Sequence, residues 1–221
     1  APQIGNRPDG NMGGGMGSRG SSDVSLIYSD DEYDSYSNIF DSAKNEITNA
    51  DKDRLIKALK NLGENNDIDS TVDVEKVIRY FVVHNFVLNF DSYTGSMIHN
   101  YYLYENDGQL SMLPWDYNLA FGGFQGASDA TSLVNYPIDS PVSGGTIDSR
   151  PMLAWIFNNS EYTEQYHELF SEFISKYFDI ITQHYLSMDP DPEQGPEVKG
   201  LGFITGIATA QNLELWEGEG G

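Results

Sequence analysis

The sequence predicts an α+β fold that is mostly helical and contains one small β-hairpin. Apolar residues recur with helical periodicity in three segments, 50–62, 71–88 and 160–186. Between the second and third segments, the tripeptide Asn106-Asp107-Gly108 separates two short runs of strand-forming residues. An Asp-Gly pair in this setting is typical of a tight hairpin turn. Helices therefore make up most of the predicted fold, with the hairpin near the middle of the chain.

The first 43 residues contain little predicted helix. Residues 1–22 are rich in glycine and lack periodicity, as in a flexible linker. Residues 24–28 form a short strand candidate. The acidic cluster that follows consists of Asp30, Asp31, Glu32 and Asp34. A calcium loop would need ligands at alternating positions and a turn glycine. Because that glycine is absent, we expect a solvated acidic turn.

Two amphipathic helices are expected next. We expect the first, over 50–62, to end at Gly63. Ser70 and Asp73 form a capping-box pattern at the start of the second, over 71–88. The apolar stripe of the first helix consists of Leu55, Ile56, Leu59 and Leu62, and that of the second of Val74, Val77, Ile78, Phe81 and Val82.

The second of these helices ends in an almost wholly apolar run, from Phe81 to Phe90. A helix that is apolar all round is buried in the centre of a domain. His84 lies within this run. We therefore expect a core histidine with satisfied hydrogen bonds rather than a catalytic one.

The predicted hairpin strands are 101–104 and 110–113, and residues 121–149 form a long segment without clear elements. A loop of this length inside a compact domain is usually functional or mobile. Arg150-Pro151 opens a further helix, because proline is favoured in the first turn. For the last helix, over 160–186, Ser160 and Thr163 are both plausible N-terminal caps. From Met188 onward, the helical periodicity of apolar residues is lost.

The charge balance limits the possible partners. The 221 residues carry a formal net charge of −22, from 34 acidic and 12 basic side chains. Such a surface repels nucleic acid and anionic membranes, favours cations or basic proteins, and also promotes solubility. The lack of cysteine excludes disulfides, zinc–thiolate sites and a cysteine nucleophile. No run approaches the roughly 18 apolar residues of a membrane span.

Asp91, Asn100 and Asp116 are the candidate site residues. Asp91 follows the buried helix, Asn100 directly precedes the first strand, and Asp116 comes shortly after the second. In protein kinases a catalytic Asp, a metal-binding Asn and a metal-binding Asp occur in this order. Asp and Asn supply the hard oxygen ligands that Mg²⁺ prefers. The order indicates a phosphoryl-transfer site, with Asn100 as a second metal ligand.

The central sequence reads NFDSYTGSMIHNYYLY and then LSMLPWDYNLAFGGF. Its flanks are YSNIF at 36–40, ADKDRLIKALKNL at 50–62, ATSLVNYPIDSPV at 130–142, RPMLAWIF at 150–157 and EYTEQYHELFSEFISKYF at 161–178. Together these stretches resemble the CotH family, the atypical secreted or spore-coat protein kinases. The resemblance covers roughly residues 22–180 and its motifs are long and unusual.

The resemblance implies the C-terminal lobe of a kinase-like fold, mostly helical, with the small hairpin at the active site. It also implies Mg²⁺-dependent use of ATP and phosphorylation of serine in basic, Ser/Lys-rich coat proteins. The implied location is the bacterial spore coat or the extracellular space. The two key aspartates of the family fall on Asp91, as base or substrate-orienting group, and on Asp116, as metal ligand and ATP-binding residue.

The chain departs from the general kinase pattern in two ways. Asn100 is farther from Asp91 than in the pattern His-Arg-Asp-x-x-x-x-Asn, and Asp116-Tyr117-Asn118 stands where Asp-Phe-Gly would be. Nothing before residue 70 resembles a strand-borne lysine with a partner glutamate. We therefore expect the N-terminal lobe to lie upstream of Ala1, and little activity from this fragment alone. The predicted organisation is a linker over 1–22, a partial kinase-like domain over 23–187 and a divergent, poorly ordered tail over 188–221.

Two other functions remain compatible with these residues. A glycoside hydrolase could use Asp91 and Asp116 as its carboxylate pair, provided that one of them has a raised pKa. A non-enzymatic acidic coat or surface module would bind cations or basic proteins through its net charge. Near the site, Tyr93 and His99 either line it or serve packing.

Overall fold

The computed structural model describes residues 23–124, 132–133 and 135–187, with side chains up to Tyr177. The predicted linker over 1–22, part of the long loop and the predicted tail from 188 lie outside these residues. The elements are η1 (Tyr33–Tyr36), α1 (Ser37–Asp41), α2 (Asn49–Glu64), α3 (Ile68–Thr71), α4 (Val74–Phe86), β1 (Tyr101–Asn106), β2 (Gln109–Pro114), η2 (Ile147–Ser149), α6 (Pro151–Phe157) and α7 (Ser160–Ser187).

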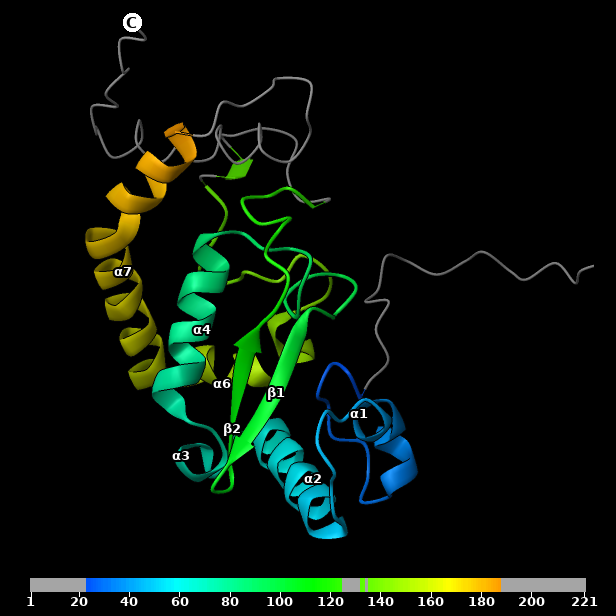
Figure 1. Ribbon diagram of the computed structural model, residues 1–221. Helices are drawn as coiled ribbons and strands as arrows, with labels where there is room; N and C mark the ends of the chain where they lie inside the picture. Colours follow the sequence, from blue (N-terminus) through cyan, green and yellow to red (C-terminus); the bar gives the residue numbers. More distant parts are fainter. Residues whose placement is uncertain (1–22, 125–131, 134, 188–221) are drawn as a thin grey trace, which may run out of the picture.

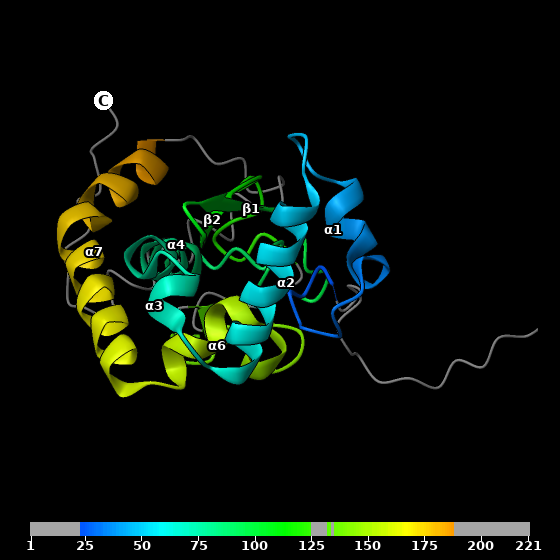
Figure 2. The ribbon, with the colours of Figure 1, turned by 90° about the horizontal axis from the view of Figure 1, so that it is seen from below.

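Helix α4 is the centre of the fold. It lies between α7 and the hairpin (Figures 1 and 2), and it packs against α7, α6 and strand β2. Helix α2 packs against α6 and α3. The two strands form one antiparallel sheet. This mixture of helices with one small sheet confirms the predicted α+β class.

The burial of the second half of α4 follows from its composition, because apolar residues cover nearly its whole circumference there, whereas Glu75, Lys76 and Arg79 in the first half are exposed. Trp155 of α6 is fully buried and meets the ring of Tyr162 edge-on at 4.9 Å. Rings from α7, including Phe170 and Phe173, pack on Phe86 at the end of α4. The buried residues of α4 are Val77, Ile78, Tyr80, Phe81, Val82, His84, Asn85 and Phe86.

The hairpin is the predicted one, with longer strands. Asn106 pairs with Gln109, so Asp107 and Gly108 form a two-residue turn. Both turn residues have positive φ, 52° and 88°, as a type I′ turn requires. Tyr104 of β1 is exposed on the outer face of the hairpin, whereas Leu110 of β2 is buried.

The ends of α2 and α4 differ from their prediction. Gly63 lies inside α2, and the helix ends in Asn65, whose left-handed conformation (φ 50°) caps it. Ser70 lies in the short helix α3 and does not cap α4. The true cap is Asp73, whose side chain accepts from the Lys76 N–H at 3.2 Å.

Helix α4 starts later than predicted because Val72 is extended. Val72 forms a bridge with Leu110 of β2, and the Asp73 N–H donates to the Leu110 carbonyl at 2.9 Å. A residue bonded to a strand in this way cannot continue a helix. The hairpin therefore sets where α4 begins.

The predicted strand over 24–28 is wrong. Residues 23–26 form a turn in which the Leu26 N–H donates to the Asp23 carbonyl at 2.8 Å. The Asp23 carboxylate accepts from the backbone and the side chain of Asn38, which ties this turn to α1. Leu26 is buried with a positive φ of 64°. Its apolar pattern therefore reflects core packing and not sheet pairing.

Two smaller details concern the C-terminal helices. Pro151 occupies the first turn of α6, as predicted. At the start of α7, the cap is Asn159, whose side chain accepts from the Glu161 N–H at 2.8 Å, whereas Thr163 donates to the Ile156 carbonyl. Within the part of the chain that is described, no helix is both long and apolar enough to span a membrane.

Candidate active site

Two loops meet at one end of the hairpin (Figure 1). The first, residues 87–100, leads from α4 to β1, and the second, residues 115–124, follows β2. Because Tyr101 pairs with Pro114, the hairpin brings the end of the first loop beside the start of the second. Backbone hydrogen bonds also tie them, from the Phe121 N–H to the Val87 carbonyl and from Gly122 to Leu88. We call them the Asp91 loop and the Asp116 loop.

Asp91 is buried, with 7% of its surface exposed, and its carboxylate is held from two sides. Asn100 Nδ2 donates to the Asp91 carbonyl at 3.0 Å and to its Oδ2 at 3.1 Å. His99 Nε2 lies 2.8 Å from Oδ1 but is not aligned for a hydrogen bond. Oδ1 therefore has no hydrogen-bond partner among the described residues, and it is buried against the His99 ring.

Asp116 has different surroundings. Its side chain is exposed and its backbone is left-handed, with φ of 54°. Within the described residues, its carboxylate makes no hydrogen bond or ion pair. The structure therefore brings Asp91 and Asn100 into contact, and it places Asp116 on the neighbouring loop without contact to either of them.

His99 is the site residue that the sequence left undecided. Its ring adjoins the Asp91 carboxylate, whereas Tyr93 is fully buried and bonds to the Ser25 carbonyl and the Met152 N–H. Tyr93 therefore serves packing. The position of His99 directly before Asn100 was the only available signal for its place beside Asp91.

His84 lies between the two loops and is fully buried, which confirms the prediction of a core histidine. Its Nδ1 is 3.2 Å from the Tyr117 hydroxyl, on the Asp116 loop. Its Nε2 is 2.6 Å from the Ser92 hydroxyl and 3.2 Å from that of Thr94, on the Asp91 loop. Burial lowers the pKa of His84 to about 3, so the ring is neutral at physiological pH.

Because His84 is buried in its neutral form, we expect the free energy of unfolding to depend on pH. The unfolded chain binds a proton below about pH 6.5, while the folded chain does so only near pH 3. The contribution of neutral His84 to the free energy of unfolding is therefore fully present above about pH 6.5. As the pH falls from about 6.5 to about 3, this contribution decreases by about 1.4 kcal/mol per pH unit. Urea unfolding of wild type and His84→Gln at pH 7.5, 6.5, 5.5 and 4.5 measures this. The difference in the free energy of unfolding between wild type and His84→Gln should decrease as the pH falls, and a difference that does not change with pH would contradict the prediction.

The turn after Asp91 leaves no space at Gly95. A Cβ there would lie 1.8 Å from the Phe90 carbonyl oxygen. Because the obstacle is backbone, Gly95→Ala must displace the loop, and we expect it to destabilise the fold by at least ~2 kcal/mol. Gly63→Ala is the matched control, since its nearest neighbour is 4.0 Å away and a helical alanine should stabilise by about 0.5–1 kcal/mol. Thermal unfolding followed by circular dichroism compares them. Equal effects would contradict this account.

A cavity of about 660 Å³ opens beside the site, between β1 and the start of α2. His99 and Asn100 line it, and its other walls include Tyr102, Ile47 and Lys44. Lys44 Nζ lies 5.6 Å from the centre of the Tyr102 ring, a cation–π contact. The cavity thus offers aromatic surface and a cation next to the residue that holds Asp91.

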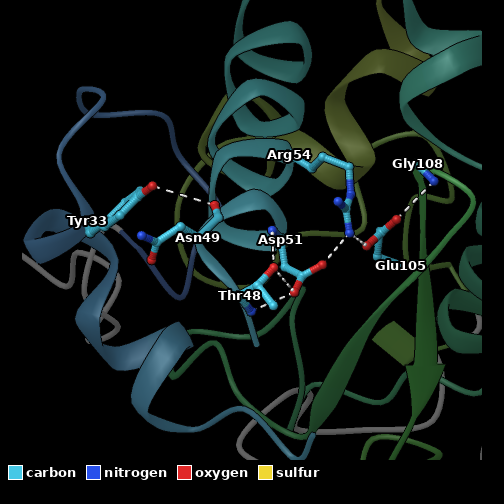
Figure 3. A network of polar contacts seen from close by, with 7 residues as sticks. All are labelled: Tyr33, Thr48, Asn49, Asp51, Arg54, Glu105 and Gly108. Atoms are coloured by element: carbon cyan, nitrogen blue, oxygen red, sulfur yellow. Dashed lines mark hydrogen bonds and ion pairs between the residues drawn. The ribbon is translucent and has the colours of Figure 1, made fainter. Parts of the chain in front are cut away.

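A polar network joins the start of α2 to the hairpin (Figure 3), and two of its members, Asp51 and Glu105, also line the cavity. Thr48 and Asp51 form a capping box at the start of α2, and Asp51 also pairs with Arg54. Arg54 reaches the hairpin at Glu105, 2.9 Å away, and Glu105 accepts from the Gly108 N–H. The hydrogen bond from Arg54 lowers the pKa of Glu105. This network fixes α2 against the hairpin.

The described residues contain no group of three or more His, Asp or Glu side chains that could hold a metal ion. A magnesium ion bound with a nucleotide does not require one, because it uses one or two carboxylates and completes its shell with water and phosphate oxygens. The exposed carboxylate of Asp116, which makes no ion pair within the described residues, has the chemistry of such a ligand. Asn100 Nδ2 is used on Asp91, which leaves its amide oxygen as a second one. The donors therefore fit Mg²⁺.

Comparison with known proteins identifies the family of the chain. The sequence model of the family described as "CotH kinase protein" matches residues 10–186, most of the chain. The protein belongs to the CotH family, as the sequence motifs indicated. Neither the curated proteins nor the solved structures contain a match.

Proposed function

We propose that the protein acts as a CotH-type protein kinase that transfers the γ-phosphoryl group of Mg-ATP to serine hydroxyls. The observation that carries this proposal is the pairing of two different aspartates at one end of the hairpin. Asp91 is buried and held in place, whereas Asp116 is exposed and free. Phosphoryl transfer needs these two kinds of carboxylate, one to orient the acceptor hydroxyl and one to bind the metal. Family membership supports the same reaction class.

Asp91 suits the acceptor hydroxyl. Asn100 fixes the carboxylate through Oδ2, whereas Oδ1 has no hydrogen bond within the described residues but is buried, so a serine hydroxyl could donate to it only once the neighbouring side chain has moved. His99 stands beside the same oxygen and would have to give way or share it. A base that is already oriented loses little entropy when the substrate binds.

Asp116 and the Asn100 amide oxygen would hold magnesium. The bound Mg-ATP supplies the transferable phosphoryl group and neutralises the charge that develops on it. The aromatic cavity beside Asn100 has room for the base of the nucleotide. Lys44 adds a positive charge at its wall.

The substrates that we propose are basic, Ser/Lys-rich proteins of the spore coat or of another extracellular layer. A net charge of −22 attracts a lysine-rich chain and repels nucleic acid. Attraction of this kind acts over about 10 Å at 0.1 M salt. Peptide affinity should therefore fall as salt is raised.

The test is transfer of labelled phosphate from ATP to a Lys- and Ser-rich peptide, with and without Mg²⁺. It is run on the 221-residue chain and on a form extended upstream of Ala1. Magnesium-dependent labelling of serine supports the kinase. Tight peptide binding without labelling by either form would instead indicate a non-enzymatic acidic module, and release of reducing sugar from a glycan would indicate a hydrolase.

A further inference from the structure

His84 is surrounded by polar groups of both aspartate-bearing loops, although it belongs to neither. Its ring stacks on Tyr80 of the same helix, with centres 5.1 Å apart and planes 19° apart. Its two nitrogens face opposite loops, Nδ1 toward Tyr117 and Nε2 toward Ser92 and Thr94. A leucine would fill this space without any hydrogen bond, so the three polar contacts of the ring require a separate explanation.

The direction of each hydrogen bond follows from the number of available hydrogens. Ser92 has one hydroxyl hydrogen, and it donates this to the Asn89 carbonyl at 2.5 Å. His84 Nε2 must then be the donor to Ser92 Oγ. A neutral imidazole has hydrogen on one nitrogen only, so Nδ1 is an acceptor and the Tyr117 hydroxyl donates to it.

Tyr117 can fill this role because its phenolic hydroxyl carries a hydrogen that it can donate. The resulting chain runs in one direction, from Tyr117 through His84 and Ser92 to the Asn89 carbonyl. Tyr117 directly follows Asp116, and Ser92 directly follows Asp91. The chain therefore joins the immediate neighbours of the two site aspartates.

We propose that His84 is a positioning residue that couples the placement of the Asp91 loop to that of the Asp116 loop through this hydrogen-bond chain. The effect on phosphoryl transfer rests on the function proposed above. The backbone bonds from Phe121 and Gly122 tie the two loops at the end of α4. In addition to these bonds and the pairing of Tyr101 with Pro114, the His84 chain links the loops through side chains next to the aspartates.

The first test needs no activity. Nitrogen NMR of the 221-residue chain, with labelled histidine, should show a neutral His84 ring with its hydrogen on Nε2 at pH 7. Tyr117→Phe removes only the donor hydroxyl and should shift the amide signals of Ser92 and Thr94. A ring with its hydrogen on Nδ1, or no response on the Asp91 loop, would overturn the proposal.

The second test is a double-mutant cycle on the transfer rate, with Tyr117→Phe, Ser92→Ala and both together. Each single change should lower kcat about tenfold. Because both act through His84, the double variant should lose about tenfold as well, and a loss near a hundredfold would overturn the coupling. The control is Tyr162→Phe, which removes a hydroxyl bonded to Asp69 and should leave kcat unchanged. The cycle uses whichever form transfers phosphate, the 221-residue chain or the form extended upstream of Ala1. If wild type transfers no phosphate in either form, the proposed function fails, and the NMR result alone decides the coupling.

Discussion

Asp116→Asn is expected to lower phosphoryl transfer from Mg-ATP by on the order of 10³-fold and to weaken magnesium-dependent nucleotide binding. The Asp116 carboxylate is exposed and makes no hydrogen bond or ion pair within the described residues, so its loss should not disturb folding. The midpoint of thermal unfolding should therefore remain at the wild-type value. Phosphate incorporation and calorimetric titration with Mg-ATP measure the two effects.

Asp91→Asn distinguishes the two aspartates. It should reduce the transfer rate by a similar factor, within the ~10²–10⁴-fold range of a lost general base, while nucleotide binding stays near wild type. Asp107→Asn is the matched control, because it makes the same charge change in the hairpin turn, where a left-handed asparagine is well tolerated. Equal loss of nucleotide binding in the Asp91 and Asp116 variants would contradict their separate roles.

Arg150→Met is expected to destabilise the fold by about 3–5 kcal/mol, the second large effect. The Arg150 side chain is fully buried and, within the described residues, pairs with no carboxylate. Its guanidinium donates to the carbonyls of Tyr93 at 2.7 Å, Gly95 at 2.8 Å and Gly144 at 2.7 Å. Methionine would leave these buried acceptors unsatisfied, at about 1–3 kcal/mol each. Urea unfolding at neutral pH measures the loss.

Two further variants separate the geometry of Arg150 from its charge. Arg150→Lys keeps the charge but cannot span three carbonyls, so it should recover only part of the stability. Arg54→Met is the surface control, because its ion pairs with Asp51 and Glu105 are exposed and should be worth less than about 1 kcal/mol. Full recovery by lysine would show that charge alone matters at position 150.

The elements that could be predicted from the sequence are those with strong local signals. The apolar periodicity of α2, α4 and α7 and the Asp107-Gly108 turn each depend on residues within a few positions of one another. Two of the errors arose where contacts between residues distant in the sequence decide the structure. Val72 leaves the helix because it meets Leu110, and the run from Val24 turns because Asp23 is held by Asn38.

The same division applies to the site. The order of Asp91, Asn100 and Asp116 along the chain can be read from the sequence alone. In the structure, Asn100 forms a hydrogen bond with Asp91. The sequence could not show that one aspartate is buried and the other free, because burial depends on how α4, the hairpin and α6 pack. Nor could it show that His84 reaches both loops, since its partners come from segments that are apart in the chain.

The sequence by itself determined the α+β class, the principal elements, the CotH family and the three candidate residues. Each of these depends on residue identity and local spacing. Only the tertiary structure decided the place of His99 beside Asp91, the anchoring of the Asp91 loop by Arg150 and the link through His84. These depend on distances between side chains that local patterns do not encode, because packing of the whole core brings them together.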